Sequence, residues 1–141
     1  MKIGIIGLGK MGEALVHGIR GSADGKKWKL EATTRSKESA KLGSKAVKIP
    51  VHTDNLKLAK SCDVLVLCVK PSQAEDVLSE IAPVLSKKKL VISVAASVTT
   101  KQMEEWIAHA CPVIRSMPNT PALIGEGMTV LTAGGDASSN H

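Results

Sequence analysis

Aromatic residues are nearly absent from this chain. Its 141 residues include no Tyr, no Phe and two Trp, while the net charge is +6. A basic surface attracts nucleic acid, but binding of single strands also needs aromatic side chains on which the bases stack. We therefore expect no nucleic-acid partner. The lysines are interpreted as solvated helix faces and loops that help to attract a polyanionic ligand.

Cysteine is scarce and unpaired in the sequence. Cys62, Cys68 and Cys111 form an odd set without a CxxC pair, unlike the disulfide frameworks of secreted domains. Cysteines and the four scattered histidines also lack the spacing of metal ligands, so we predict no metal site.

Long hydrophobic runs are missing too. No apolar stretch has the length needed to span a bilayer, so we expect no membrane partner. The first apolar run is short and interrupted by glycine, unlike a signal peptide, which favours a cytoplasmic protein. The length suits a single domain.

The N-terminal stretch is the most informative one present. An apolar run over 3–8 is typical of a buried strand. It breaks into Gly7-x-Gly9-x-x-Gly12, and a helical stretch over 13–20 follows. In this context Gly7 permits a tight turn, Gly9 lets the backbone approach a pyrophosphate, and Gly12 allows close packing of helix and strand. The helix N-terminus adds free N–H groups. We predict a dinucleotide site at Ile6, Gly7, Leu8, Gly9, Lys10, Met11 and Gly12; a glycine-rich turn that binds nothing is the alternative.

Short apolar runs and helical stretches alternate along the rest of the chain. Further strands are expected at 30–33, 47–50, 63–69, 90–95, 112–117 and 128–132. Helices are expected at 36–42 with Gly43 as the stop, at 55–60, at 72–85, and from Thr99 or Thr100 to 110. This alternation predicts an α/β fold of the Rossmann type, a doubly wound, mostly parallel sheet with helices on both faces.

The second expected strand lacks an acidic residue at its end. NAD-binding units carry an Asp or Glu about 20 residues after the glycines, where it holds the ribose. Here the strand ends in Thr33-Thr34-Arg35-Ser36, and arginine with hydroxyls suits the extra phosphate of NADP. We predict that Thr34, Arg35 and Ser36 make NADPH bind more tightly than NADH. The alternative is that Arg35 is an ordinary loop cation.

Further cofactor contacts are expected outside the carboxyl ends of the strands. The candidates are Cys68, Val69, Lys70, Pro71, Val94, Ala95 and Ala96. The small side chains of Ala95 and Ala96 leave room for a ring. Lys70 contacts ribose or phosphate, or else faces solvent.

Four strings occur in an order that resembles the N-terminal, cofactor-binding domain of pyrroline-5-carboxylate reductase. They are Ile6–Gly12, Asp63–Pro71 with its Val-Lys-Pro, Ser93–Thr99, and Arg115–Pro121 with Met-Pro-Asn-Thr-Pro. The resemblance covers nearly everything from Met1 to Gly135. It implies NAD(P)H-dependent reduction of 1-pyrroline-5-carboxylate to L-proline, the last step of proline biosynthesis. Asn55 matches a cofactor-contacting asparagine of that family.

The resemblance also implies a small imino-acid substrate and, in full-length members, a homo-oligomer. The family's C-terminal helical domain is absent from this sequence, so we expect 1–135 to be an NADP-binding domain that is incomplete at its C-terminal end. A polar tail is expected over 136–141, with disorder from Gly134 onward. Members of the family have glycine where this chain has Ser97, beside the expected nicotinamide position.

The loop after the sixth strand holds the substrate-proximal candidates, Asn119 and Thr120. A turn made rigid by two prolines is the competing interpretation. No residue is marked as a general acid. Two alternative functions remain: a non-catalytic dinucleotide-binding or regulatory module, and a β-hydroxyacid dehydrogenase, which shares the GxGxMG opening but has a serine-glycine-rich string after the sixth strand.

Overall fold

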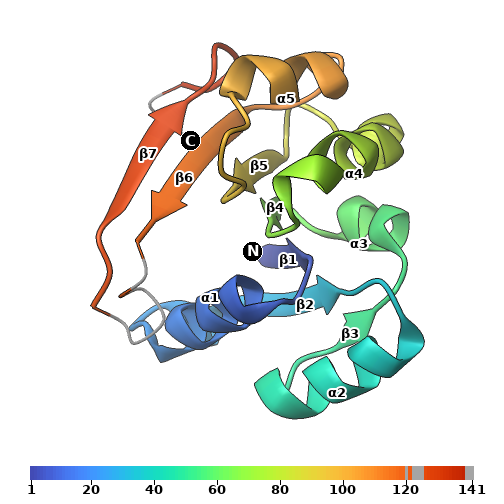
Figure 1. The fold of residues 1–141 in the computed structure, drawn as a ribbon, viewed down its shortest axis with the longest axis vertical. Coiled ribbons are helices and arrows are strands. Elements are labelled where there is room, and N and C mark those ends of the chain that lie inside the picture. The colour runs from blue at the N-terminus through green and yellow to red at the C-terminus, as the bar shows by residue number, and fades with distance from the viewer. Residues whose placement is uncertain (120, 122–125, 139–141) are drawn as a thin grey trace.

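The computed structural model describes residues 1–119, 121 and 126–138, and within them the strands form one seven-stranded sheet (Figure 1). The strand order is β3-β2-β1-β4-β5-β6-β7. The strands are β1 (Lys2–Ile6), β2 (Lys29–Thr33), β3 (Val51–His52), β4 (Val64–Leu67), β5 (Leu90–Ser93), β6 (Val113–Pro118) and β7 (Thr129–Ala133). All pairs are parallel except β6 with β7. The prediction of a mostly parallel sheet is confirmed.

Helices cover both faces of this sheet. They are α1 (Lys10–Gly21), α2 (Lys37–Val47), α3 (Asn55–Ser61), α4 (Ala74–Ile81) and α5 (Thr100–Trp106), with 3-10 turns at Gly25–Lys27, Pro71–Gln73 and Ala82–Val84. One core packs α3, α4 and α5 against the sheet, and the other packs α1 and α2 against the opposite face. The doubly wound α/β fold is confirmed. Among the described residues, every helix is too short or too polar to cross a bilayer.

The chain reverses its direction of winding at β1. It first adds β2 and β3 on one side of β1, and then returns to place β4 on the other side. In open α/β sheets, ligands bind at the carboxyl ends of the strands beside such a switch point. The end of β1 is where the glycine turn begins, so topology and sequence motif coincide.

Helix α2 corrects two expectations. It runs through Gly43 to Val47 and ends at Lys48, whose φ of 54° is left-handed. Gly43 is buried, and a Cβ there would lie 2.7 Å from Cδ2 of Leu8. Glycine at this position therefore allows close packing and is not a helix stop. The strand expected over 47–50 is also wrong, because these residues end α2 and lead into β3.

Two other helices are shorter than expected: the helix expected over 72–85 is divided into three parts, and α5 ends at Trp106 and not at 110. The stretch 72–85 is a 3-10 turn, α4 and a second 3-10 turn that holds Pro83, since proline removes an N–H donor and clashes with the preceding helical turn. Helix α5 begins after Thr99, whose Oγ1 accepts the N–H of Gln102 at 3.2 Å while the Gln102 side chain accepts the N–H of Thr99 at 3.0 Å. This capping box confirms the predicted start of the helix.

The C-terminal residues are bound to α5. The N–H of Asp136 donates to Oε1 of the buried Glu104 at 2.9 Å, and its carboxylate bonds to Nδ1 of His109 at 2.7 Å. The hydrogen bond from His109 holds the pKa of the Asp136 carboxyl below its usual range. Disorder is therefore the wrong expectation for 134–138, whereas 139–141 lie outside the described residues.

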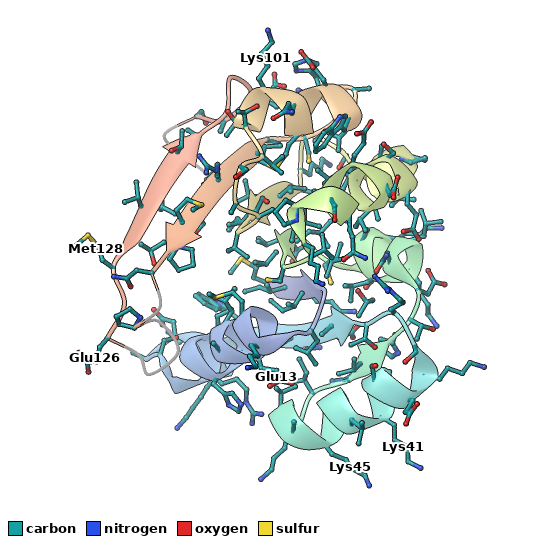
Figure 2. The ribbon with its side chains drawn as sticks, in the orientation of Figure 1. Glu13, Lys41, Lys45, Lys101, Glu126 and Met128 are labelled. Carbon is teal, nitrogen blue, oxygen red and sulfur yellow. The ribbon has the colours of Figure 1, made fainter. Side chains whose placement is uncertain are left out.

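Lysines lie on solvated helix faces, as expected: Lys41 and Lys45 extend from α2 into solvent (Figure 2).

Strand β7 is unusual, because all five of its residues are exposed. Its apolar members Val130 and Leu131 are 59% and 65% exposed.

Candidate dinucleotide-binding site

The glycine turn is fixed against the end of β2. The carbonyl oxygen of Thr33 accepts the N–H groups of Gly7 at 3.1 Å and Leu8 at 3.0 Å. Gly7 has a φ of +93°, which L-residues rarely adopt, and a Cβ there would lie 2.9 Å from the carbonyl oxygen of Cys68. A Cβ on Gly9, in contrast, would meet no atom within 4 Å. The turn is tight at Gly7 and open at Gly9, as the motif predicts; the approach of a pyrophosphate to Gly9 stays a prediction.

Helix α1 begins directly after this turn. Gly9 is its N-cap and makes no side-chain capping bond. The first helical N–H groups have no acceptor inside a helix, and here they belong to Lys10, Met11 and Gly12. Together with the positive end of the helix dipole, these N–H groups are suited to a phosphate group.

A cavity of about 550 Å³ lies at the carboxyl ends of the central strands. It brings together the glycine turn, the end of β2, the end of β4 and one face of α4. Ten predicted site residues line it: Ile6, Gly7, Leu8, Gly9, Thr34, Arg35, Asn55, Cys68, Val69 and Lys70. The sequence analysis missed Thr33, Ser39, Thr53, Gln73, Val77 and Glu80. Lys10, Met11, Gly12, Ser36, Pro71, Val94, Ala95 and Ala96 are not among the lining residues.

The end of β2 presents a cation and hydroxyls to this cavity. Arg35 is exposed, and Thr34 and, from α2, Ser39 are also among the lining residues. Ser36 has a different role, since its Oγ accepts the N–H of Ser39 at 3.1 Å and caps α2. This cap agrees with the helix start expected at Ser36. Ser39, one helical turn further on, brings the second hydroxyl to the cavity.

Three side chains form a chain of hydrogen bonds along the cavity wall. The hydroxyl of Thr33 donates to Oδ1 of Asn55 at 2.7 Å, and Nδ2 of Asn55 donates to Oε2 of Glu80 at 2.9 Å. Thr33 is 1% exposed, whereas Asn55 is half-buried and Glu80 is exposed. The wall thus links β2, α3 and α4.

The end of β4 lines the cavity with the uncharged side chains of Cys68 and Val69, followed by the cation Lys70. Burial raises the pKa of the Cys68 thiol to about 12, so this cysteine is a thiol and not a thiolate near neutral pH. Val69 is half-buried and Lys70 is exposed. Of the candidates after β5, Ala95 is buried and Ala96 is exposed. Ser97 has a φ of 61°, in the left-handed region that favours glycine.

Asn119 closes the hairpin of β6 and β7. Its N–H donates to the carbonyl of Met128 at 3.1 Å, and its Oδ1 accepts the Met128 N–H at 3.0 Å. These bonds give Asn119 a structural role between the two strands, in line with the competing interpretation. Thr120, the other substrate-proximal candidate, lies outside the described residues.

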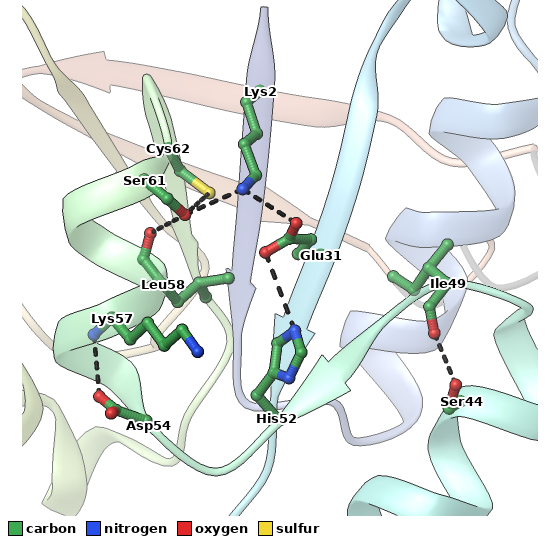
Figure 3. Close-up of polar contacts among 10 residues, drawn as sticks. All are labelled: Lys2, Glu31, Ser44, Ile49, His52, Asp54, Lys57, Leu58, Ser61 and Cys62. Atoms are coloured by element: carbon green, nitrogen blue, oxygen red, sulfur yellow. Dashed lines mark hydrogen bonds and ion pairs between the residues drawn. The ribbon is translucent and has the colours of Figure 1, made fainter.

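A second polar cluster lies on the α3 side of the sheet, toward the amino end of β1 (Figure 3). Lys2 Nζ pairs with Glu31 at 2.9 Å and donates to Ser61 Oγ at 3.0 Å, and His52 Nε2 lies 3.9 Å from the other Glu31 oxygen. The hydrogen bond to Glu31 raises the pKa of Lys2. Across the described parts of the chain, no three His, Cys, Asp or Glu side chains gather as a metal site would require.

Known proteins share this architecture. Residues 2–97 match the family described as NADP oxidoreductase, coenzyme F420-dependent. The chain belongs to this family. It is 41% identical over 135 residues to a pyrroline-5-carboxylate reductase of Corynebacterium melassecola, covering 94% of this chain and 50% of that protein. The family match and this relative confirm the resemblance inferred from the motifs.

Solved structures of pyrroline carboxylate reductases have the same fold over nearly the whole of this chain. A Plasmodium falciparum pyrroline carboxylate reductase with NADP bound has a TM-score of 0.82 at 34% identity, over 99% of this chain and 50% of that one. A pyrroline-5-carboxylate reductase from Coxiella burnetii has a TM-score of 0.86 at 34% identity, over 98% and 51%. The chain therefore spans about half the length of the relatives that it matches.

Proposed function

We propose that this chain supplies the cofactor-binding half of an NADPH-dependent pyrroline-5-carboxylate reductase, which reduces 1-pyrroline-5-carboxylate to L-proline. The observation that carries the proposal is the cavity at the β1/β4 switch point. It joins an open glycine turn to an arginine and hydroxyls at the end of β2. The similarity to reductases over nearly the whole chain supports the choice of substrate.

The residues fit a phosphorylated dinucleotide. The free N–H groups at the start of α1 would hold the pyrophosphate, and Arg35 with Thr34 and Ser39 would hold the 2′-phosphate. A bound nicotinamide supplies the hydride that reduces the C=N bond. The protein's contribution is to orient the rings and exclude water, for which the half-buried, uncharged side chains of Cys68 and Val69 are suited.

We further infer that residues 1–135 form one cofactor-binding domain, and that the substrate is a small imino acid. Assembly as a homo-oligomer, as the resemblance implies, also stays a prediction. The three cysteines are free, and two of them are buried. Free thiols fit the reducing cytoplasm that the sequence analysis favours.

Calorimetric titration of the purified chain with NADPH, repeated with NADH, tests the site. Saturable binding that favours NADPH is the expected result. A folded chain that binds neither cofactor would rule out the dinucleotide site. Equal affinities would instead reject the role of Arg35 as a phosphate ligand.

Turnover separates the enzyme from the alternatives. NADPH oxidation that depends on 1-pyrroline-5-carboxylate supports the reductase, measured on this chain and on any longer form of the protein. Binding without turnover in every form would favour a non-catalytic module. Turnover of a β-hydroxyacid in place of the imino acid would favour the dehydrogenase.

A further inference from the structure

The amide of Asn55 has two possible orientations, related by exchange of Oδ1 and Nδ2. Of its two neighbours, Thr33 accepts both orientations and Glu80 accepts one. The Thr33 hydroxyl is either a donor or an acceptor, so it accommodates both Oδ1 and Nδ2. An ionised carboxylate only accepts, and Glu80 therefore accommodates Nδ2 alone. The distances of 2.7 Å to Thr33 and 2.9 Å to Glu80 belong to the orientation with Nδ2 toward Glu80.

We propose that Glu80 is a positioning residue for cofactor binding, which holds the amide of Asn55 in the orientation that the ligand requires. This inference rests on the proposed function. With one N–H given to Glu80, Asn55 keeps a second N–H and a lone pair of Oδ1 for a ligand in the cavity that it lines. Around bound metal ions, the groups that orient a ligating side chain matter nearly as much as the ligand itself, and Glu80 would act on the amide of Asn55 in the same way.

The charge of Glu80 by itself would weaken the binding of a phosphorylated cofactor. Its carboxylate lines a cavity that also contains Arg35 and the glycine turn, where phosphate groups are expected. A negative charge in such a cavity repels a polyanion. If charge alone mattered, replacing Glu80 by a neutral residue would strengthen NADPH binding. If Glu80 orients Asn55, the same replacement weakens it, so the two explanations predict opposite signs.

The experiment is a double-mutant cycle measured by calorimetry with NADPH. Glu80→Ala should weaken binding about 3- to 10-fold, as expected for loss of one well-placed hydrogen bond. Glu80→Gln should fall between Glu80→Ala and the unmodified chain, since its amide oxygen still accepts from Nδ2 but no longer excludes the flipped amide. Asn55→Ala combined with Glu80→Ala should bind no more weakly than Asn55→Ala alone.

Controls separate this role from a structural one. Glu75→Ala removes another exposed carboxylate of α4 that is not among the cavity-lining residues, and it should leave the dissociation constant unchanged. Unfolding temperatures identify any variant that weakens binding through loss of the fold. The proposal is overturned if Glu80→Ala binds NADPH as well as, or better than, the unmodified chain, or if the two substitutions add. Failure of the unmodified chain to bind NADPH would instead reject the proposed function.

Discussion

Gly12 lies so close to Gly7 that a Cβ on Gly12 would stand 2.6 Å from the Gly7 carbonyl oxygen. Nothing but glycine fits there unless the turn moves, because the obstacle is backbone and not a flexible side chain. The start of α1 and the first turn of the motif are thus one rigid unit. That rigidity fixes the free N–H groups of α1 directly after Gly9, which lines the cavity and where the turn remains open.

Two substitutions in this motif should have different effects. Gly12→Ala forces the turn apart, and we expect a loss of about 1–3 kcal/mol of unfolding free energy. Gly9→Ala has open space around the new Cβ and an extended backbone. The reduced freedom of the unfolded chain offsets the loss of a better N-cap residue, so the unfolding free energy of this variant should change by less than about 1 kcal/mol. Its methyl group would nevertheless occupy the path of a pyrophosphate, and NADPH affinity should fall at least about tenfold.

Chemical denaturation and calorimetry on both variants make the comparison. Gly18→Ala, in the middle of α1 with open space at its Cβ, is the matched control and should stabilise the chain by up to about 1 kcal/mol. A Gly9→Ala variant that binds NADPH normally would contradict the assigned pyrophosphate position.

Arg35→Ala tests the origin of cofactor preference. We expect NADPH affinity to fall about tenfold or more, since a hydrogen bond to a charged group contributes about 1.5–3 kcal/mol. NADH lacks the 2′-phosphate and should lose little. Lys37→Ala removes an equal charge from a neighbouring exposed side chain that is not among the cavity-lining residues, so it controls for a general loss of positive charge. Equal losses for both cofactors would show that Arg35 acts only through the surface potential.

Ser97→Gly should stabilise the chain. A left-handed φ of 61° costs an L-residue about 1–2 kcal/mol, and glycine avoids this cost but loses about 0.5–1 kcal/mol through greater freedom when unfolded. The net gain in unfolding free energy should therefore lie between zero and about 1.5 kcal/mol. Ser79→Gly, inside α4, makes the same exchange in helical backbone and should destabilise by about 0.5 kcal/mol. If both variants lose stability, the backbone at Ser97 is not strained.

The glycine turn and the order of elements were predictable because their signals are local. A short apolar run followed by spaced glycines and a helix specifies the turn, and alternation of apolar runs with helical stretches specifies a parallel sheet. Gly43 could not be interpreted in the same way. Glycine either ends a helix or permits close packing. Here its role is set by contact with Leu8, which is distant in the sequence.

The wall of the cavity formed by α4 was missed for a similar reason. The rule that ligands bind at the carboxyl ends of strands predicts Cys68, Val69 and Lys70. It does not predict which side chains a helix contributes to the same cavity. Gln73, Val77 and Glu80 lie along one face of the 3-10 turn and α4, with the spacing of any amphipathic helix. Only the packing of α4 beside α3 reveals that Glu80 reaches Asn55.

The ion pair of Lys2 with Glu31 should make stability depend on pH in the alkaline range. Glu31 raises the pKa of Lys2 above its ordinary value of 10.5, so the folded chain binds this proton more tightly than the unfolded chain. The resulting stabilisation is complete below 10.5 and disappears as the pH rises through the raised pKa. Lys2→Met should therefore lower the unfolding free energy at pH 8 by less than about 1 kcal/mol, since a quarter of each side chain is exposed. Lys26→Met, in an exposed turn, should have the same unfolding free energy as the unmodified chain both at pH 8 and above the raised pKa of Lys2. The prediction fails if Lys2→Met and the unmodified chain still differ by the same unfolding free energy once the pH exceeds the raised pKa. The difference would then come from packing of the lysine stem and not from its charge.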